Sequence, residues 1–336
     1  MKQRTPSFWY RPAESRAPLK ERFLAPLSRL YMLGYRIHRL FVKPQKASTP
    51  VLCVGNLVAG GTGKTPAAIC LVETLRKHGL ARNPYFLVRG YGGAEIGPLL
   101  VDPAKHTAWD TGDEALLLAR SAPTIVSPNR IIGAQMAADR GADIIIMDDG
   151  LQNPGIHKDI KLAVINGEMG FGNGKTLPAG PLRQPLAQGL QQVDAFILVG
   201  EDKRNALKLI PEGKTVLRAT LKTSDHADIS KKKTYLAFAG IGYPQKFFTF
   251  LQETVGLNLA EAVPFPDHYP YEESDLKMLH EKARALGAEL LTTEKDFLRL
   301  PKIENITVHT LPVDMVWNDE DAVLRHFESA LPRTRP

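Results

Sequence analysis

The strongest candidate for chemistry is a run of six residues whose types and order match a phosphate-binding loop: Gly60, Gly61, Thr62, Gly63, Lys64 and Thr65. Glycines let backbone N–H groups approach phosphate oxygens, a lysine can reach the β- and γ-phosphates, and the following hydroxyl can bind magnesium. We predict that the run binds a nucleotide, with Lys64 on the phosphates and Thr65 on the metal. The first glycine of the usual pattern falls on Val58, so a glycine-rich turn without a ligand stays open from this segment alone.

Two aspartates follow a strongly apolar stretch. Residues 143–147 predict a buried strand, and Asp148, Asp149 and Gly150 come directly after it. Such a strand can deliver a carboxylate to a metal–nucleotide site at the C-terminal edge of a sheet. We therefore predict that Asp148 binds magnesium and that Asp149 assists at the metal. For this motif taken alone, an aspartate that caps a loop is the alternative.

A third carboxylate stands where a helix is expected to begin. Gly112, Asp113 and Glu114 precede the apolar run 115–119. One interpretation is that Asp113 only caps the helix. The other is that Asp113 is catalytic and accepts the proton of an attacking hydroxyl group.

Four further segments could contact a substrate. Arg89 to Gly93 follow an expected strand and form either a turn or a loop that presents Tyr91. Arg130 and Arg183 are candidates for anionic groups, because the planar fork of arginine bonds phosphate at two points. His268 lies in the second half of the chain and is either catalytic or structural. Thr293–Asp296 resembles a guanine-binding motif in composition only, since its order is wrong, and we predict no GTPase from it.

Short apolar runs alternate with amphipathic stretches through most of the chain. This pattern predicts an α/β fold with a P-loop NTPase-like, mostly parallel sheet that is covered on both faces. A polar segment at residues 224–233, ending in three lysines, marks a boundary before a second, smaller α/β unit. The expected strands are 51–55, 85–89, 124–127, 143–147, 162–165, 195–199, 214–222, 235–239 and 289–292. The expected helices are 22–42, 65–78, 113–120, 130–140, 245–255 and 274–286.

The positive charge is concentrated at the N-terminus. Residues 1–46 contain eleven Lys or Arg and two acidic residues, a net charge of +9, which leaves −2 for the rest of a chain whose total is +7. A nucleic-acid enzyme more often spreads such charge along a groove, so we predict no nucleic-acid partner. We divide the chain into a basic amphipathic head (1–43), a P-loop kinase unit (44–223) and a smaller C-terminal unit (224–336).

Composition indicates the compartment. No run of about 20 apolar residues is present, so we predict no transmembrane helix. Charges interrupt the N-terminal apolar stretches, which argues against a signal peptide. Cys53 and Cys70 lie among apolar residues and are predicted to be buried thiols in a reducing cytoplasm.

These motifs, in this order, resemble the lipid A 4'-kinase (tetraacyldisaccharide 4'-kinase) family. The resemblance extends over residues 51–297, and Val58 is no departure, because the family does not keep the first glycine. Pro66 after the loop threonine and the doubled aspartate before Gly-Leu-Gln are unusual among P-loop proteins. The matching segments are 55–57, 59–66, 89–93, 112–114, 129–130, 148–152, 177–183, 265–268 and 293–296.

The resemblance implies a phosphotransferase that uses ATP and Mg²⁺ to phosphorylate the 4'-hydroxyl of tetraacyldisaccharide 1-phosphate, giving lipid IVA in lipid A (lipopolysaccharide) biosynthesis. It implies a peripheral protein on the cytoplasmic face of the inner membrane, which meets a lipid A disaccharide precursor and an anionic membrane surface. It also implies that His268 supports Asp113 from the second unit. Two positions depart from the family pattern: Asn153 and Tyr269 stand where members often have histidine.

Two other functions stay open on the residues. A P-loop kinase of a small soluble molecule would have the same loop, but the basic head suits an anionic membrane surface better. The alternative for that head is a helix that only packs on the kinase unit. An assembly ATPase with a deviant phosphate loop often carries a second lysine near the start of the loop, and residues 55–63 contain none.

Overall fold

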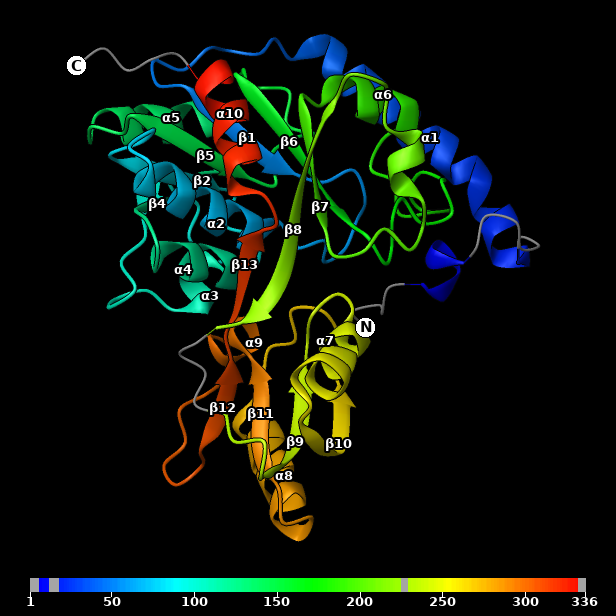
Figure 1. Ribbon diagram of the computed structural model, residues 1–336, viewed down its shortest axis with the longest axis vertical. Helices are drawn as coiled ribbons and strands as arrows, with labels where there is room; N and C mark the ends of the chain where they lie inside the picture. The colour runs from blue at the N-terminus through cyan, green and yellow to red at the C-terminus, as the bar shows by residue number, and fades with distance from the viewer. Residues whose placement is uncertain (1–5, 12–17, 225–228, 332–336) are drawn as a thin grey trace.

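The computed structural model describes residues 6–11, 18–224 and 229–331, which form two units stacked along the longest axis of the molecule (Figure 1). The basic residues Lys2, Arg4 and Arg16 lie outside the described residues. We call the two units the larger and the smaller unit, after the sheets they contain.

The larger unit is built on a mostly parallel sheet, as predicted. Its strands are Val51–Gly55 (β1), Pro84–Val88 (β2), Leu99–Leu100 (β3), Thr124–Val126 (β4), Ile144–Asp148 (β5), Ile160–Asn166 (β6), Ala195–Val199 (β7), Thr215–Thr223 (β8) and Val313–Trp317 (β13). Among the described residues they form nine strands in the order β13-β8-β7-β6-β1-β5-β2-β4-β3. Only the edge strands β13 and β3 run antiparallel to their neighbours. The C-terminal ends of β1, β5 and β2 therefore lie together at one edge.

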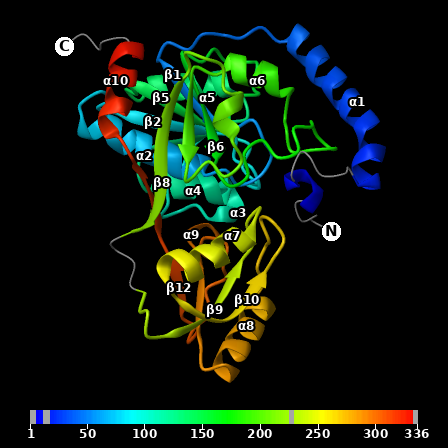
Figure 2. The same cartoon turned by 45° about the vertical axis from the view of Figure 1, so that its right-hand side comes forward.

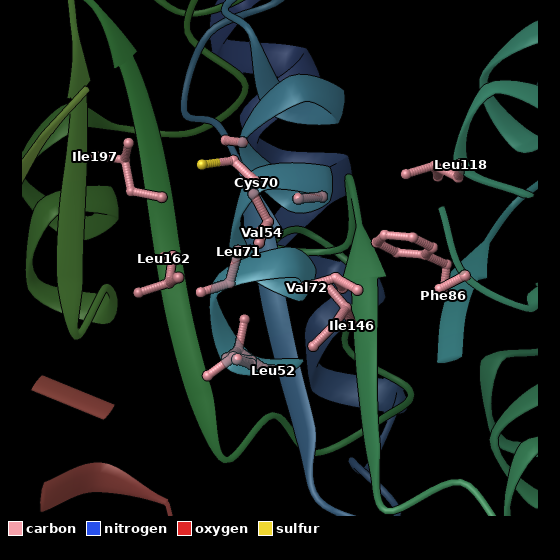
Figure 3. Close-up of a cluster of buried hydrophobic side chains, with 14 of the residues drawn as sticks. Leu52, Val54, Cys70, Leu71, Val72, Phe86, Leu118, Ile146, Leu162 and Ile197 are labelled. Carbon is pink, nitrogen blue, oxygen red and sulfur yellow. The ribbon is translucent and has the colours of Figure 1, made fainter. Parts of the chain in front are cut away.

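Helices cover both faces of this sheet. They are Leu19–Phe41 (α1), Lys64–Lys77 (α2), Ala108–Thr111 (α3), Asp113–Ala119 (α4), Arg130–Ala138 (α5), Leu186–Gln192 (α6) and Glu320–Ala330 (α10), with short 3-10 turns at Ser7–Tyr10 and Ala206–Leu209. The largest core cluster packs α2 and α4 against one face of the sheet. Figure 3 shows part of it, with labelled side chains Leu52, Val54, Cys70, Leu71, Val72, Phe86, Leu118, Ile146, Leu162 and Ile197.

The smaller unit has a second parallel sheet. Its strands are Thr234–Ala239 (β9), Asn258–Pro264 (β10), Glu289–Thr293 (β11) and Val308–Leu311 (β12), in the order β10-β9-β11-β12. Its helices are Pro244–Thr249 (α7), which continues into a π-helical turn at Phe250–Val255, Glu273–Ala285 (α8) and Glu294–Phe297 (α9). Tyr235, Phe238 and Leu291 are buried between the sheet and its helices.

The C-terminal end of the chain differs from the sequence-based expectation. We expected residues 224–336 in one unit, but β13 pairs with β8 in the larger sheet, and Val323 and Phe327 of α10 are buried in the larger core. Short strands and a single amphipathic helix carry no sign of which sheet they join, so the sequence could not place them. The division of the chain into three domains otherwise remains a prediction.

The described part of the N-terminal head, the turn at Ser7–Tyr10 and helix α1, lies along the outside of the larger unit (Figures 1 and 2). Ser28 of α1 donates a hydrogen bond to the Thr176 carbonyl at 2.8 Å. Ahead of the helix, the Tyr10 hydroxyl donates to the carbonyl of Ala59, next to the glycine-rich loop, at 3.0 Å. Buried Glu21 bonds the guanidinium of Arg11, and its pKa is held at about 2, first by this hydrogen bond. The head is therefore not an isolated arm.

Candidate active site

The glycine-rich loop joins the buried strand β1 to helix α2, as a phosphate-binding loop requires. Gly63 has φ of 91°, a left-handed conformation that turns the chain into the first helical residue, Lys64. The side chain of Asn56, which follows β1, donates a hydrogen bond to the Thr62 hydroxyl at 3.0 Å and so stabilises the loop. The N–H groups at the start of α2 thus point toward the space above the sheet edge, where an anion is favoured.

Asp148 reaches this loop from the neighbouring strand. It ends β5, in register with Val54 of β1, and one of its carboxylate oxygens accepts a hydrogen bond from the Thr65 hydroxyl at 3.1 Å. The other oxygen, Oδ1, is buried and has no hydrogen-bond partner among the described residues. Burial, and then the charge of Glu114, raise the pKa of Asp148. A hydroxyl and an unsatisfied carboxylate oxygen are the hard oxygen ligands that Mg²⁺ takes.

Asp149 is held by two cations. Arg183 donates hydrogen bonds to both carboxylate oxygens of Asp149, at 2.6 and 3.0 Å, and Lys64 Nζ lies 3.8 Å from one of these oxygens. Burial raises the pKa of Asp149, but the charges of Lys64 and Arg183 outweigh it and leave the pKa lowered. The Asp149 carboxylate thus links Lys64 and Arg183, and its assistance at the metal remains a prediction.

Asp113 and His268, which are 155 positions apart in the sequence, meet between the two units. His268 Nδ1 lies 3.3 Å from Asp113 Oδ2, and the other oxygen of Asp113 accepts the N–H of Glu114 at 2.9 Å. Gly112 precedes this carboxylate because a Cβ there would come within 2.5 Å of the Tyr91 carbonyl. His268 has a left-handed φ of 53°, and its N–H donates to the Gly240 carbonyl at 2.9 Å.

The surroundings keep Asp113 ionised. Burial raises its pKa, but the contact with His268 and the charges of Lys295 and Arg299 more than compensate, and the pKa is lowered to about 2. Asp113 itself is 3% exposed, whereas His268 lines the cleft. The histidine ring therefore lies on the cleft side of the carboxylate and can share the proton that the carboxylate attracts.

The predicted substrate residues take different positions. Tyr91 is exposed, and its ring meets the His268 ring edge-on at 5.3 Å between centroids. Arg130 begins α5 and is buried at the cleft wall, and burial lowers its pKa to about 10. Its Nε has no hydrogen-bond partner among the described residues, so one N–H remains for an anionic group. Arg183 lines the same cleft but is engaged by Asp149.

Two charged residues of the site were not predicted. Lys295 Nζ pairs with Glu114 at 2.8 Å, and Arg299 Nε lies 3.2 Å from Asp113 Oδ2. Both belong to the smaller unit, while both carboxylates begin α4 of the larger unit. The only signal was the motif Thr293–Asp296, whose residue types stood out without an assignable role.

A cleft of about 1220 Å³ lies between the two units. The phosphate loop, Asp148 and Arg130 line it from the larger unit, and His268, Lys295 and Phe247 line it from the smaller one. Across residues 6–11, 18–224 and 229–331, no group of three or more His, Cys, Asp or Glu is placed to hold a metal ion. A P-loop site needs none, because Mg²⁺ there keeps water and phosphate ligands besides one or two protein oxygens.

A parallel α/β sheet with a glycine-rich loop after its first strand and an aspartate at the end of the neighbouring strand defines a P-loop nucleotide-binding protein. His268, which contacts Asp113, lines the same cleft as the loop, and such a carboxylate–imidazole pair can take a proton from a reacting hydroxyl group. A model of the family described as tetraacyldisaccharide-1-P 4'-kinase matches residues 20–332, and the chain belongs to this family.

Individual relatives agree over almost the whole chain. A tetraacyldisaccharide 4'-kinase of Rhodospirillum centenum is 44% identical over 324 residues, which cover 96% of this chain and 95% of the relative. One of Gluconacetobacter diazotrophicus is 48% identical over 312 residues, or 93% and 94% of the two chains. Among solved structures, the "apo" form of LpxK from Aquifex aeolicus in complex with ATP matches with a TM-score of 0.72 and 25% identity, over 92% of this chain and 100% of that one.

Proposed function

We propose that this chain transfers the γ-phosphate of ATP to the 4'-hydroxyl of tetraacyldisaccharide 1-phosphate, giving lipid IVA and ADP. The observation that carries the proposal is the position of the Asp113–His268 pair across one cleft from the phosphate loop, in a member of the 4'-kinase family. The loop supplies the donor side of the reaction. The pair supplies the acceptor side, where a sugar hydroxyl must lose its proton.

The residues divide the work as follows. The 4'-hydroxyl gives its proton to the Asp113–His268 pair while its oxygen bonds the γ-phosphorus, and the bridging oxygen leaves with ADP. A positioned base contributes about 10²–10⁴-fold to such a rate. Lys64 neutralises charge on the transferring group, and its ammonium group lies 3.8 Å from the Asp149 carboxylate, which Arg183 holds at both oxygens. Arg130, with its unpartnered N–H, is placed to bind an anionic group of the substrate or nucleotide.

Magnesium fits the site. Thr65 Oγ1 and the unsatisfied Asp148 Oδ1 are the protein oxygens that would hold it. Bound there with the nucleotide, Mg²⁺ would offset the negative charge of the β- and γ-phosphates.

Mass spectrometry tests the function directly. The full chain, ATP, magnesium chloride and tetraacyldisaccharide 1-phosphate are incubated together, and the lipid is expected to gain one phosphate. A parallel reaction without the lipid measures ADP release. Rapid ADP formation without the lipid, and no phosphate on the lipid, would favour the assembly ATPase instead.

We further propose that α1 binds the cytoplasmic face of the inner membrane. No helix among the described residues has the length and apolar content to span a bilayer. One side of α1 packs on the larger unit through Glu21, Ser28 and Met32. Apolar side chains on its other side are exposed, which suits a helix lying in the interface of an anionic membrane. They are Leu19, Phe23, Leu27, Leu30, Leu33, Ile37, Leu40 and Phe41.

Replacing Phe23, Leu30, Leu40 and Phe41 together by serine is expected to weaken binding to anionic vesicles by at least about tenfold, because burial of a large apolar side chain contributes about 1.5–3 kcal/mol. Vesicle co-sedimentation measures the binding. Leu209 and Leu286 are exposed and do not belong to α1, and their replacement by serine is the matched control, expected to leave binding unchanged. Equal binding by all three proteins would limit α1 to a packing role.

A further inference from the structure

Arg299 lies at the boundary of the two units and makes several hydrogen bonds. Nη2 donates to the Asp296 carboxylate at 2.6 Å and to the Gly240 carbonyl at 3.0 Å, while Nη1 donates to the Tyr269 carbonyl at 3.1 Å. The guanidinium carbon lies 5.8 Å from the centre of the Tyr271 ring. The side chain is 9% exposed. The smaller unit therefore fixes the guanidinium of Arg299 in one orientation.

Asp296, the main partner of Arg299, is itself held in place. Its Oδ1 also accepts the N–H of Gly240 at 2.9 Å and the hydroxyl of Tyr271 at 3.0 Å, and its Oδ2 accepts the Thr293 hydroxyl at 2.7 Å. This network gives contacts to Thr293 and Asp296 of the motif Thr293–Asp296, for which the residues alone had suggested no role.

One nitrogen of Arg299 faces the larger unit. Nε lies 3.2 Å from Asp113 Oδ2, the oxygen that His268 Nδ1 approaches at 3.3 Å, and it is 3.5 Å from the Lys295 carbonyl. The Gly240 carbonyl accepts both the N–H of His268 and Nη2 of Arg299. The contact of Arg299 with the carboxylate is thus an ion pair without hydrogen-bond geometry. Arg299 also shares the Gly240 carbonyl with His268.

We propose that Arg299 is a positioning residue for phosphoryl transfer, which aligns the Asp113 carboxylate with His268 when the smaller unit lies against α4. This proposal rests on the proposed function. Three hydrogen bonds to Asp296, Gly240 and Tyr269 fix the planar guanidinium of Arg299. A fixed guanidinium restrains the Asp113 carboxylate more closely than the flexible ammonium group of a lysine would. The other titratable groups that face Asp113 are His268 and Lys295 of the smaller unit and Glu114 of its own helix. Arg299 contacts the Asp113 carboxylate, whereas Lys295 bonds Glu114.

Steady-state kinetics of three variants test the proposal. Because the base contributes about 10²–10⁴-fold, Arg299→Gln is expected to lower kcat by roughly tenfold or more, with the KM for ATP nearly unchanged. Arg299→Lys is expected to recover part of the loss, since it restores the charge but not the fork. Arg284→Gln is the matched control, because Arg284 is exposed on α8 of the same unit, and wild-type kcat is expected.

The decisive measurement repeats Arg299→Gln in an Asp113→Asn background. A residue that acts through Asp113 is expected to cause little further loss there, whereas a residue that only stabilises the fold would cause the same fold-loss in both backgrounds. Equal losses would overturn the proposal. Should Arg299→Gln fail to fold because Asp296 keeps its charge, the variant Arg299→Gln/Asp296→Asn removes both charges and takes its place in the cycle. Failure of the wild-type chain to phosphorylate the lipid would instead refute the proposed function.

Discussion

Lys64→Ala is expected to reduce phosphoryl transfer to the lipid by at least about 10²–10³-fold, the loss that follows removal of one preorganised charge or donor at a transition state. Lys64 begins α2 with its ammonium group 3.8 Å from Asp149, at the edge of the cleft where the γ-phosphate would lie. Loss of the charge leaves the transferring group without its main protein cation. Production of lipid IVA, followed by mass spectrometry, measures the effect.

Asp148→Asn is expected to be equally inactive but not less stable. Burial raises the pKa of Asp148, so the ionised form costs folding free energy at a pH above the ordinary carboxyl value. The amide removes that cost, and the melting temperature without nucleotide is expected to stay equal or rise at pH 7.

Lys77→Ala at the other end of α2, where the side chain is 64% exposed, is the control for Lys64→Ala. Near wild-type turnover in either site variant, with unchanged melting, would contradict the nucleotide site.

His268→Ala and Asp113→Ala are both expected to lower kcat, with Asp113→Ala losing at least as much, within the 10²–10⁴-fold (about 3–5 kcal/mol) that a positioned base supplies. The two side chains touch at 3.3 Å across the boundary between the units. Because they accept one proton as a pair, the double variant is expected to be scarcely worse than Asp113→Ala alone. Steady-state kcat of the three variants, with the KM for ATP as an internal check, measures the coupling.

Strictly multiplicative losses in the double variant would show that the two residues act independently. His268 would then be a structural residue, or one that contacts the lipid. A large rise in the KM for ATP with unchanged kcat would place the effect on nucleotide binding, which the pair is not proposed to serve.

The sequence was most informative where function depends on a few consecutive residues. The phosphate loop, the strand that ends in Asp148 and the alternation of strands and helices were all predicted, because each leaves a local pattern of residue types. The resemblance to a known family implied that His268 meets Asp113, and the structure shows the contact.

What the sequence missed depends on contacts between distant segments. Nothing local indicates that Lys295 and Arg299 face two consecutive carboxylates 181 and 186 positions earlier. Likewise, the sequence analysis predicted no strand at β13, and its antiparallel pairing with β8 assigns it to the larger sheet. The contacts of Lys295 and Arg299, and the sheet that β13 joins, are properties of the assembled fold. They cannot be predicted from composition and periodicity.

The return of β13 to the larger sheet has a mechanical consequence. Within the described residues, the chain leaves the larger unit through β8 and comes back through β13, and these strands pair as far as Thr223 and Val313, with the Ser224 N–H bonded to the Pro312 carbonyl at 3.0 Å. Figure 1 shows the two strands side by side above the smaller unit. A hydrogen-bonded ribbon bends across its flat face more easily than it shears in its own plane. Opening of the cleft is therefore expected to be a hinge rotation about a single axis, which returns the same imidazole and guanidinium to the same carboxylate after every turnover.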